Sequence, residues 1–236
     1  MTVKNPNLAY LVAPWIDIAT SVSASTAYLI KRALEQMGYV VKEFYGILDW
    51  NFIFTNLLPL HDPGVVIYTG HGLKDKWLGD DPFLGTLTTD QAYLLKDRAV
   101  IAVPSCYTAS GLGIEAVKEG ARFYVGSNDL VWVAWNEWDH EYRRDFEFTW
   151  FTLVVSILNG ISPKESLITY KELCTSIAKY YEDNNLPNGD YYAGLLIHNR
   201  DHMVVLGNEN DILVPPIAYD PKDIQQINNN PSVSRY

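Results

Sequence analysis

Two short apolar runs, each ending at a chemically reactive side chain, constrain the fold of this chain most strongly. The first, Val65–Thr69, leads into Gly70-His71-Gly72, and the second, Ala99–Val103, leads into Pro104-Ser105-Cys106. Both runs are apolar on both faces, which is typical of strands buried in the middle of a parallel sheet. We therefore expect two central parallel strands, with His71 and Cys106 just beyond their carboxyl ends.

The segments around these two runs alternate between strand and helix patterns. Apolar and β-branched runs predict strands over 8–13, 39–45 and 122–126. Helical patterns predict helices over 21–37, 50–58, 111–119, 146–158 and 162–181, and a short helix after Thr88. Three later runs, 191–197, 203–206 and 212–214, are expected to pair as strands at a sheet edge, and 70–85 is expected to be a loop. This alternation predicts an α/β fold with a mostly parallel central sheet of about six strands, flanked by helices.

No internal repeat or change in composition marks a second domain. We therefore predict a single domain over residues 1–217. The remaining stretch, 218–236, is rich in Asn and Gln and has no apolar period, so we expect a loosely ordered C-terminal tail.

The composition excludes several classes of protein. A net charge of -10 argues against binding to nucleic acid or to an anionic membrane, because no block of Lys or Arg is present to neutralise phosphates. The two cysteines, Cys106 and Cys174, are too few for a disulfide framework or a structural zinc site, so a reducing, cytoplasmic location is expected. No apolar run reaches membrane-spanning length.

The types of residue at the two strand ends suit nucleophilic chemistry. In a parallel α/β sheet, ligands bind beyond the carboxyl ends of the strands, so adjacent strands would place the His71 ring and the Cys106 thiol on the same edge. A thiolate is a strong nucleophile, and an imidazole beside it can carry protons; a helix N-terminus after Cys106 would favour the thiolate. The backbone N–H groups of Gly72 and Cys106 are the expected oxyanion donors.

Each of these residues also has an ordinary structural interpretation. A cysteine after a strand is often a small buried hydrophobic residue, and we expect this of Cys174 within its predicted helix. His140 has metal-ligating neighbours but no second histidine at helical spacing, so a solvated helix start is favoured. His198 and His202 are interpreted as flanking a turn between strands, and the tryptophan-rich stretch 131–138 as packing under a loop or lining a groove.

The order of these motifs resembles the caspase-like superfamily of cysteine peptidases, which includes caspases, legumains, gingipains and clostripain. The resemblance is closest to gingipain-type and CHAT-type domains and extends over the segments 65–72, 100–113, 120–127, 148–166 and 203–207. Two features differ from that pattern: Pro104-Ser105 stands where many relatives have an acidic residue or glutamine and then alanine, and Gly207-Asn208 stands where gingipain-like chains have Gly-Asp-Pro.

The resemblance implies a three-layer caspase-like fold and a cysteine endopeptidase that needs no cofactor or metal and acts on a peptide or protein substrate. Cys106 would be the nucleophile and His71 the proton carrier. The resemblance further implies a specificity pocket formed by Asp129, Asp17 and Asn128, in which a carboxylate would select Arg or Lys. Each aspartate could equally be a capping or turn residue.

Two other functions are compatible with the sequence. The first is a catalytically silent caspase-like interaction or scaffold module, which the Pro104-Ser105 departure and the C-terminal tail favour. The second is a nucleotide-binding α/β protein, which is the least favoured because no Gly-x-Gly-x-x-Gly or Gly-Lys-Ser/Thr signature follows a strand. The oligomeric state is left open.

Overall fold

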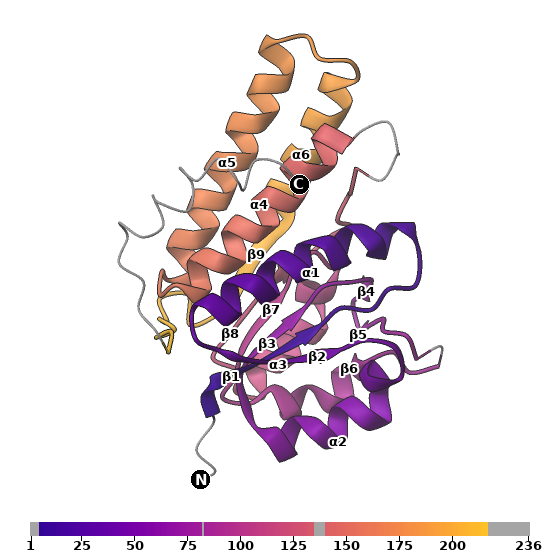
Figure 1. Ribbon diagram of the computed structural model, residues 1–236, viewed down its shortest axis with the longest axis vertical. Coiled ribbons are helices and arrows are strands. Elements are labelled where there is room, and N and C mark those ends of the chain that lie inside the picture. Colours follow the sequence, from indigo (N-terminus) through magenta and orange to yellow (C-terminus); the bar gives the residue numbers. More distant parts are fainter. Residues whose placement is uncertain (1–4, 82, 135–139, 217–236) are drawn as a thin grey trace.

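A six-stranded sheet forms the centre of the molecule (Figure 1). The computed structural model describes residues 5–81, 83–134 and 140–216. The strand order is β2-β1-β3-β7-β8-β9, and every neighbouring pair is parallel except β8 and β9. The strands are β1 (Asn5–Val12), β2 (Val40–Phe44), β3 (Pro63–Tyr68), β7 (Ala99–Ala102), β8 (Phe123–Ser127) and β9 (Met203–Gly207).

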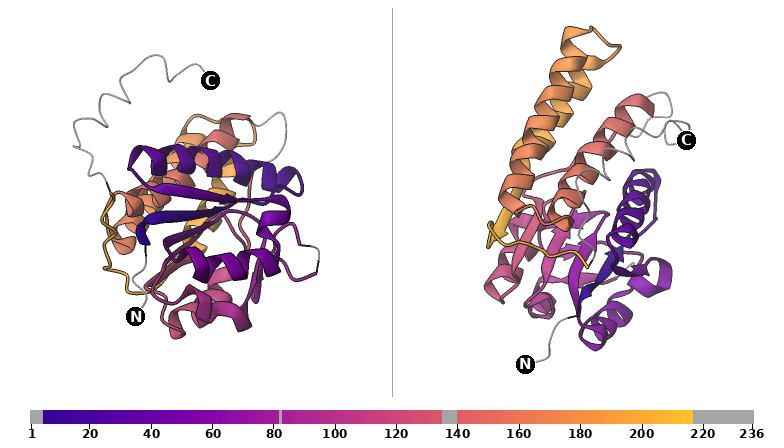
Figure 2. Two further views of the ribbon diagram at one scale, coloured as in Figure 1. Left: turned by 60° about the horizontal axis from the view of Figure 1, so that its bottom comes forward. Right: turned by 60° about the vertical axis from the view of Figure 1, so that its left-hand side comes forward.

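Helices cover both faces of the sheet and make a three-layer α/β fold (Figures 1 and 2). The helices are α1 (Ile18–Gln36), α2 (Asn51–His61), α3 (Leu112–Lys118), α4 (His140–Leu158), α5 (Pro163–Asp183) and α6 (Gly189–His202), with short 3-10 helices η1 (Gly46–Asp49), η2 (Thr89–Leu95) and η3 (Thr108–Ser110). The predicted fold class is confirmed.

Two hydrophobic clusters hold the layers together, and alternate residues of the central strands belong to opposite clusters. Val65 and Ile67 of β3 join the cluster under α1, α4, α5 and α6, whereas Val66 and Tyr68 join the cluster under α2, η2 and α3. This is the two-residue period of a strand buried on both faces, and it explains why the run carries no charged residue.

Capping residues fix where two helices begin. Asp17 accepts a hydrogen bond from the Thr20 N–H, and the Thr20 side chain closes the capping box, so α1 begins at Ile18 rather than near residue 21 as predicted. Ser162 caps α5, with Pro163 in its first turn, as the sequence indicates.

Several predictions about elements were wrong. Residues 191–197 lie in α6 and not in a strand, because Tyr192, Ala193, Leu196 and Asn199 form one buried helical stripe. Residues 212–214 form no strand, and the expected loop 70–85 contains β4 (Gly72–Leu73) and β5 (Lys76–Trp77), which pair with β6 (Leu87–Thr88) in a small antiparallel sheet. The predicted strand at 203–206 is confirmed as β9.

Two predictions fall on residues outside the described ranges. The proposed C-terminal tail, 218–236, is one, and part of the tryptophan-rich stretch, 135–138, is the other. Among the described helices, none combines the length and apolar character that crossing a lipid bilayer requires.

Candidate active site

The segments that carry His71 and Cys106 leave the sheet side by side. Strands β3 and β7 are parallel neighbours, in register from Val65 opposite Ala99 to Tyr68 opposite Ala102. The pairing continues past the strands, since the Gly70 N–H donates to the Pro104 carbonyl at 3.0 Å. The predicted adjacency of the two strand ends is therefore confirmed.

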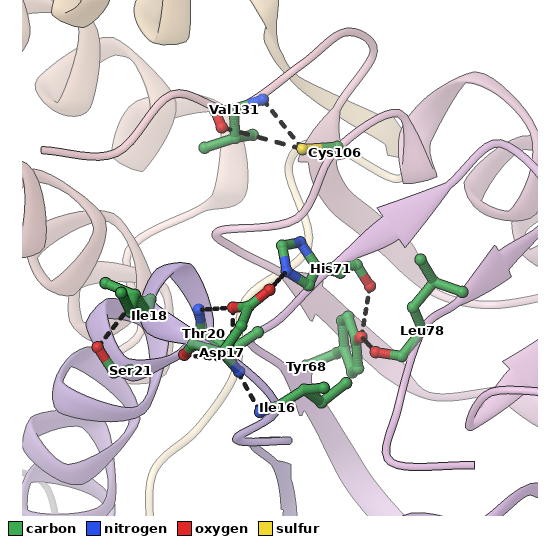
Figure 3. Close-up of polar contacts among 10 residues, drawn as sticks. All are labelled: Ile16, Asp17, Ile18, Thr20, Ser21, Tyr68, His71, Leu78, Cys106 and Val131. Atoms are coloured by element: carbon green, nitrogen blue, oxygen red, sulfur yellow. Dashed lines mark hydrogen bonds and ion pairs between the residues drawn. The ribbon is translucent and has the colours of Figure 1, made fainter. Parts of the chain in front are cut away.

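A small cavity of about 80 Å³ lies between the histidine and the cysteine. Its described lining is mostly apolar or neutral: Ala19, Thr20, Ser23, Gly70, His71, Pro104, Ser105, Cys106, Val131 and Val133. No hydrogen bond joins the Cys106 thiol to the His71 ring; the two side chains face a shared space instead (Figure 3). A group bound in that space would contact both.

Asp17 holds the His71 ring. The distance between His71 Nε2 and Asp17 Oδ2 is 2.8 Å, and Asp17 is at the same time the N-cap of α1 (Figure 3). Partial burial opposes the charged carboxylate, but the Thr20 N–H and the His71 ring outweigh it and lower the pKa of Asp17. Asp17 is therefore an ionised carboxylate directed at one ring nitrogen, which orients the imidazole.

The backbone at His71 is fixed from the other side. The Tyr68 hydroxyl contacts the carbonyl oxygens of His71 and Leu78, each at 2.5 Å (Figure 3). Tyr68 is fully buried and its ring stacks on Trp77, with centroids 4.8 Å apart. The histidine thus sits on a rigid support although its own ring is 37% exposed.

The Cys106 thiol is held by the loop that follows β8. Its sulfur accepts from the Val131 N–H at 3.3 Å and lies 3.9 Å from the Val131 carbonyl oxygen. Burial raises the pKa of the Cys106 thiol, the Val131 N–H opposes this in part, and the negative charge of Asp129 adds to the rise. The expectation of a thiolate favoured by a following helix is not met here, because α3 begins only at Leu112, after η3.

The two expected oxyanion donors lie close together. A side chain at Gly72 would come within 2.4 Å of Ser105 Oγ and 2.5 Å of the Cys106 carbonyl oxygen, so only glycine allows the two segments to approach this closely. The Cys106 N–H makes no hydrogen bond to any residue in the described ranges. It is therefore available to a ligand.

The residues predicted to form a specificity pocket lie elsewhere. Asp17, Asn128 and Asp129 are absent from the described lining of the cavity. The Asp129 carboxylate accepts from the Leu130 N–H at 2.8 Å, and the Asn128 side chain contacts His202. Their part in substrate specificity stays a prediction.

Some site residues were not found from the sequence. Thr20 and Ser23 line the cavity because α1 begins early, and an Asp-x-x-Thr capping box was the signal that could have shown it. Asn199, on α6, accepts from the Trp132 N–H at 2.9 Å and donates to its carbonyl at 2.7 Å, fixing the loop that carries Val131. No local sequence signal marks Asn199.

The three-layer α/β fold of the chain is similar to that of two solved structures, whose fold is of the caspase-like kind. The structure matches the Arg specific cysteine proteinase gingipain R (RgpB), with a TM-score of 0.54 and 15% identity over 91% of this chain and 50% of that one. It also matches the complex of Porphyromonas gingivalis RgpB pro- and mature domains, with a TM-score of 0.51 and 13% identity over 93% of this chain and 52% of that one.

This likeness concerns the fold. The chain spans about half the length of the two solved structures it matches. No family model and no curated protein sequence matches the chain. The resemblance noted in the sequence is therefore confirmed at the level of the fold.

Proposed function

We propose that this protein is a cysteine peptidase in which Cys106 is the nucleophile and His71 the general acid and base. The observation that carries the proposal is the placement of both side chains at the ends of adjacent parallel strands, facing one cavity, with Asp17 directed at the ring. A nucleophile, a base and a group that orients the base form the arrangement expected for acyl transfer.

The proposed reaction follows from these positions. When a peptide carbonyl enters the cavity, the Cys106 proton passes to His71 as the sulfur attacks the carbonyl carbon. The N–H groups of Gly72 and Cys106 stabilise the oxyanion, and His71 gives its proton to the departing amine. Water, deprotonated by His71, then hydrolyses the thioester and restores the thiol. Asp17 stabilises the imidazolium formed in each half of the reaction.

Cleavage after Arg or Lys is the more specific part of the proposal, with Asp129 and Asn128 as the residues that would recognise the basic side chain. Asp17, the third residue predicted for this role, has its carboxylate engaged by His71 and Thr20. The open pocket itself favours a different class of substrate, because its volume of about 80 Å³ and its lining without a carboxylate suit a small uncharged residue. A panel of peptides that differ only at the residue before the scissile bond distinguishes a preference for a basic residue from a preference for a small uncharged one. A basic preference should be lost in Asp129→Asn.

The test of the proposal combines turnover with covalent labelling. We expect peptide hydrolysis to fall by at least about 10³-fold in Cys106→Ala and in His71→Ala. A peptidyl electrophile should label the unmodified protein and not the Cys106→Ala variant. Cys174→Ala is the matched control, because this second free thiol lies buried in the core and should not affect labelling. Hydrolysis that survives in Cys106→Ala would show that the nucleophile is wrong.

A catalytically silent interaction module is the second candidate function. The observation that favours it is the Cys106 thiol, which is engaged by Val131 and has a raised pKa. On this alternative no peptide in a diverse library is cleaved, no electrophile labels Cys106 selectively, and binding to a protein partner survives in Cys106→Ala. Selective labelling of Cys106 counts against it.

A further inference from the structure

A second cluster of polar side chains lies where α6 meets the loop that follows β8. His198 and His202 are one turn apart on α6, and Asp129 reaches them from the loop. One possible ligand atom from each of the three residues lies within 4.8 Å of the other two. All three residues are half-buried, so solvent can reach the cluster.

The hydrogen bonds of His202 leave one ring nitrogen without a proton. Nδ1 of His202 lies 2.8 Å from the Asn128 side-chain oxygen, which can only accept, so Nδ1 carries the hydrogen. In the neutral ring, Nε2 then carries a lone pair and no hydrogen. It lies 3.7 Å from Asp129 Oδ2. Two acceptors that face each other at this distance repel, and a second proton on the ring, a cation or a donating water molecule would relieve the repulsion.

The other two residues are similarly arranged. Asp129 Oδ1 accepts from the Leu130 N–H at 2.8 Å, and Oδ2 lies 3.7 Å from His202 Nε2. The Tyr107 side chain also hydrogen-bonds to this carboxylate, so a metal would compete with it. His198 Nε2 lies 3.1 Å from the Leu130 carbonyl oxygen, so one nitrogen of this ring is also fixed by an acceptor. Histidines held in this way by a neighbouring oxygen are the usual form of metal-ligating imidazoles.

We propose that Asp129, His198 and His202 bind a divalent transition-metal ion of the zinc class, with a water molecule in the remaining position. Two imidazoles and one carboxylate are suitable ligands for zinc, and the i, i+4 spacing on a helix places both rings on one face. Tetrahedral zinc with bonds of about 2.0–2.1 Å separates its ligand atoms by about 3.4 Å, close to the 3.7 Å between His202 Nε2 and Asp129 Oδ2.

The site would join two elements that meet beside Cys106. Asp129 is two residues from Val131, whose backbone contacts the Cys106 sulfur, and the Tyr107 N–H donates to the Asp129 carbonyl at 2.9 Å. A metal bound here would therefore tie α6 to the loop that holds the thiol. The site excludes the proposed nucleophile and base but shares Asp129 with the residues proposed to recognise a basic side chain, and a bound metal would occupy that carboxylate instead. Metal binding can be measured without any catalytic assay.

The experiment is a titration of the full-length Cys106→Ala chain with Co²⁺, followed by displacement with Zn²⁺. The Cys106→Ala background removes thiolate coordination by the candidate nucleophile. We expect visible absorption bands typical of four-coordinate Co²⁺ that Zn²⁺ abolishes. His198→Gln, His202→Gln and Asp129→Asn should each weaken binding by more than about tenfold, and Asn128→Ala by about tenfold through loss of the orienting hydrogen bond.

His140→Gln is the matched control, because His140 is an exposed histidine at the start of α4 and should leave the affinity unchanged. The thermal unfolding midpoint gives a second measurement. This midpoint should rise with Zn²⁺ in the Cys106→Ala chain. It should not rise in the Cys106→Ala, His198→Gln double variant, whose folding is checked by circular dichroism. Absence of Co²⁺ bands, or equal affinity in the ligand variants, would overturn the proposal and leave His202 and Asp129 as an ion pair only.

Discussion

Single residues at the site show how one side chain can serve two purposes. Asp17 caps α1 through Oδ1 and meets His71 through Oδ2, so the start of the helix and the orientation of the imidazole depend on one carboxylate. The sequence placed Asp17 near the active site but assigned it to substrate recognition. The contact with His71 depends on β1 and β3 being neighbours, which the local sequence around residue 17 does not reveal.

The two roles of Asp17 can be separated by substitution. Asn and Ser are both good N-caps, so Asp17→Asn and Asp17→Ser should keep the free energy of unfolding within about 1 kcal/mol. Neither stabilises an imidazolium as a carboxylate does, so we expect kcat to fall by about 10²–10⁴-fold with a smaller change in KM.

The measurement is the pH profile of kcat together with urea unfolding, and Asp17→Glu is the conservative variant that should restore part of the activity. If Asp17→Asn lowers stability and activity in parallel, then Asp17 acts only as a helix cap.

At the scale of elements, α6 and the loop after β8 determine how Cys106 is held. Asn199 is 1% exposed and pairs with both backbone groups of Trp132. Val131, the neighbouring residue, contacts the Cys106 sulfur. The sequence predicts the stretch 191–197 as a strand at a sheet edge, and on that prediction it has no effect on the loop.

Removing the Asn199 side chain should release this loop. In Asn199→Ala, the Trp132 N–H and carbonyl lose buried partners, and we expect a loss of about 1–3 kcal/mol in the free energy of unfolding. Alkylation of Cys106 by iodoacetamide should become faster as Val131 moves away.

Asn56→Ala is the control, because Asn56 is exposed on α2 and its side chain contacts only the helix backbone at Phe52. An unchanged alkylation rate in a destabilised Asn199→Ala would show that α6 does not restrain the thiol.

At the scale of the whole molecule, a fully buried carboxylate makes the free energy of unfolding depend on pH. Asp49, at the end of η1, is 0% exposed and accepts from the Asp80 N–H at 3.0 Å. Burial, helped by the negative charges of Asp80 and Asp81, raises the pKa of Asp49 to about 7. Asp49 therefore favours the protonated form in the folded protein.

The sign of the pH effect follows from this raised pKa. Between about pH 4 and pH 7 the unfolded chain has lost the Asp49 proton while the folded protein keeps it, so stability falls as pH rises, by about 4 kcal/mol at most. Asp49→Asn keeps an acceptor for the Asp80 N–H and removes the charge. We expect it to be more stable than the parent at pH 8 and nearly equal at pH 5 in urea unfolding.

Asp75→Asn, at an exposed position, serves as the control and should not change the pH dependence. A parent chain as stable at pH 8 as at pH 5, with no gain from Asp49→Asn at pH 8, would contradict the prediction.

The local sequence was enough to predict the six strands of the central sheet, most helices and the residue types of the strand-end pair. These follow from local physics: apolar runs without polar interruption are stable only when buried on both faces, and capping residues such as Ser162 act within one turn. The positions of His71 and Cys106 past two such runs then indicated the chemistry.

Which side chains contact one another depends on how elements distant in the sequence pack together. Asp17 with His71, Val131 with Cys106, and Asp129 with His202 are contacts between residues 25 to 73 positions apart. The stretch 191–197 likewise lies in α6 and not in a strand, because one stripe of its residues is buried against the core beside α5. The sequence thus identified the reactive pair, and the packing of distant elements determined what surrounds it.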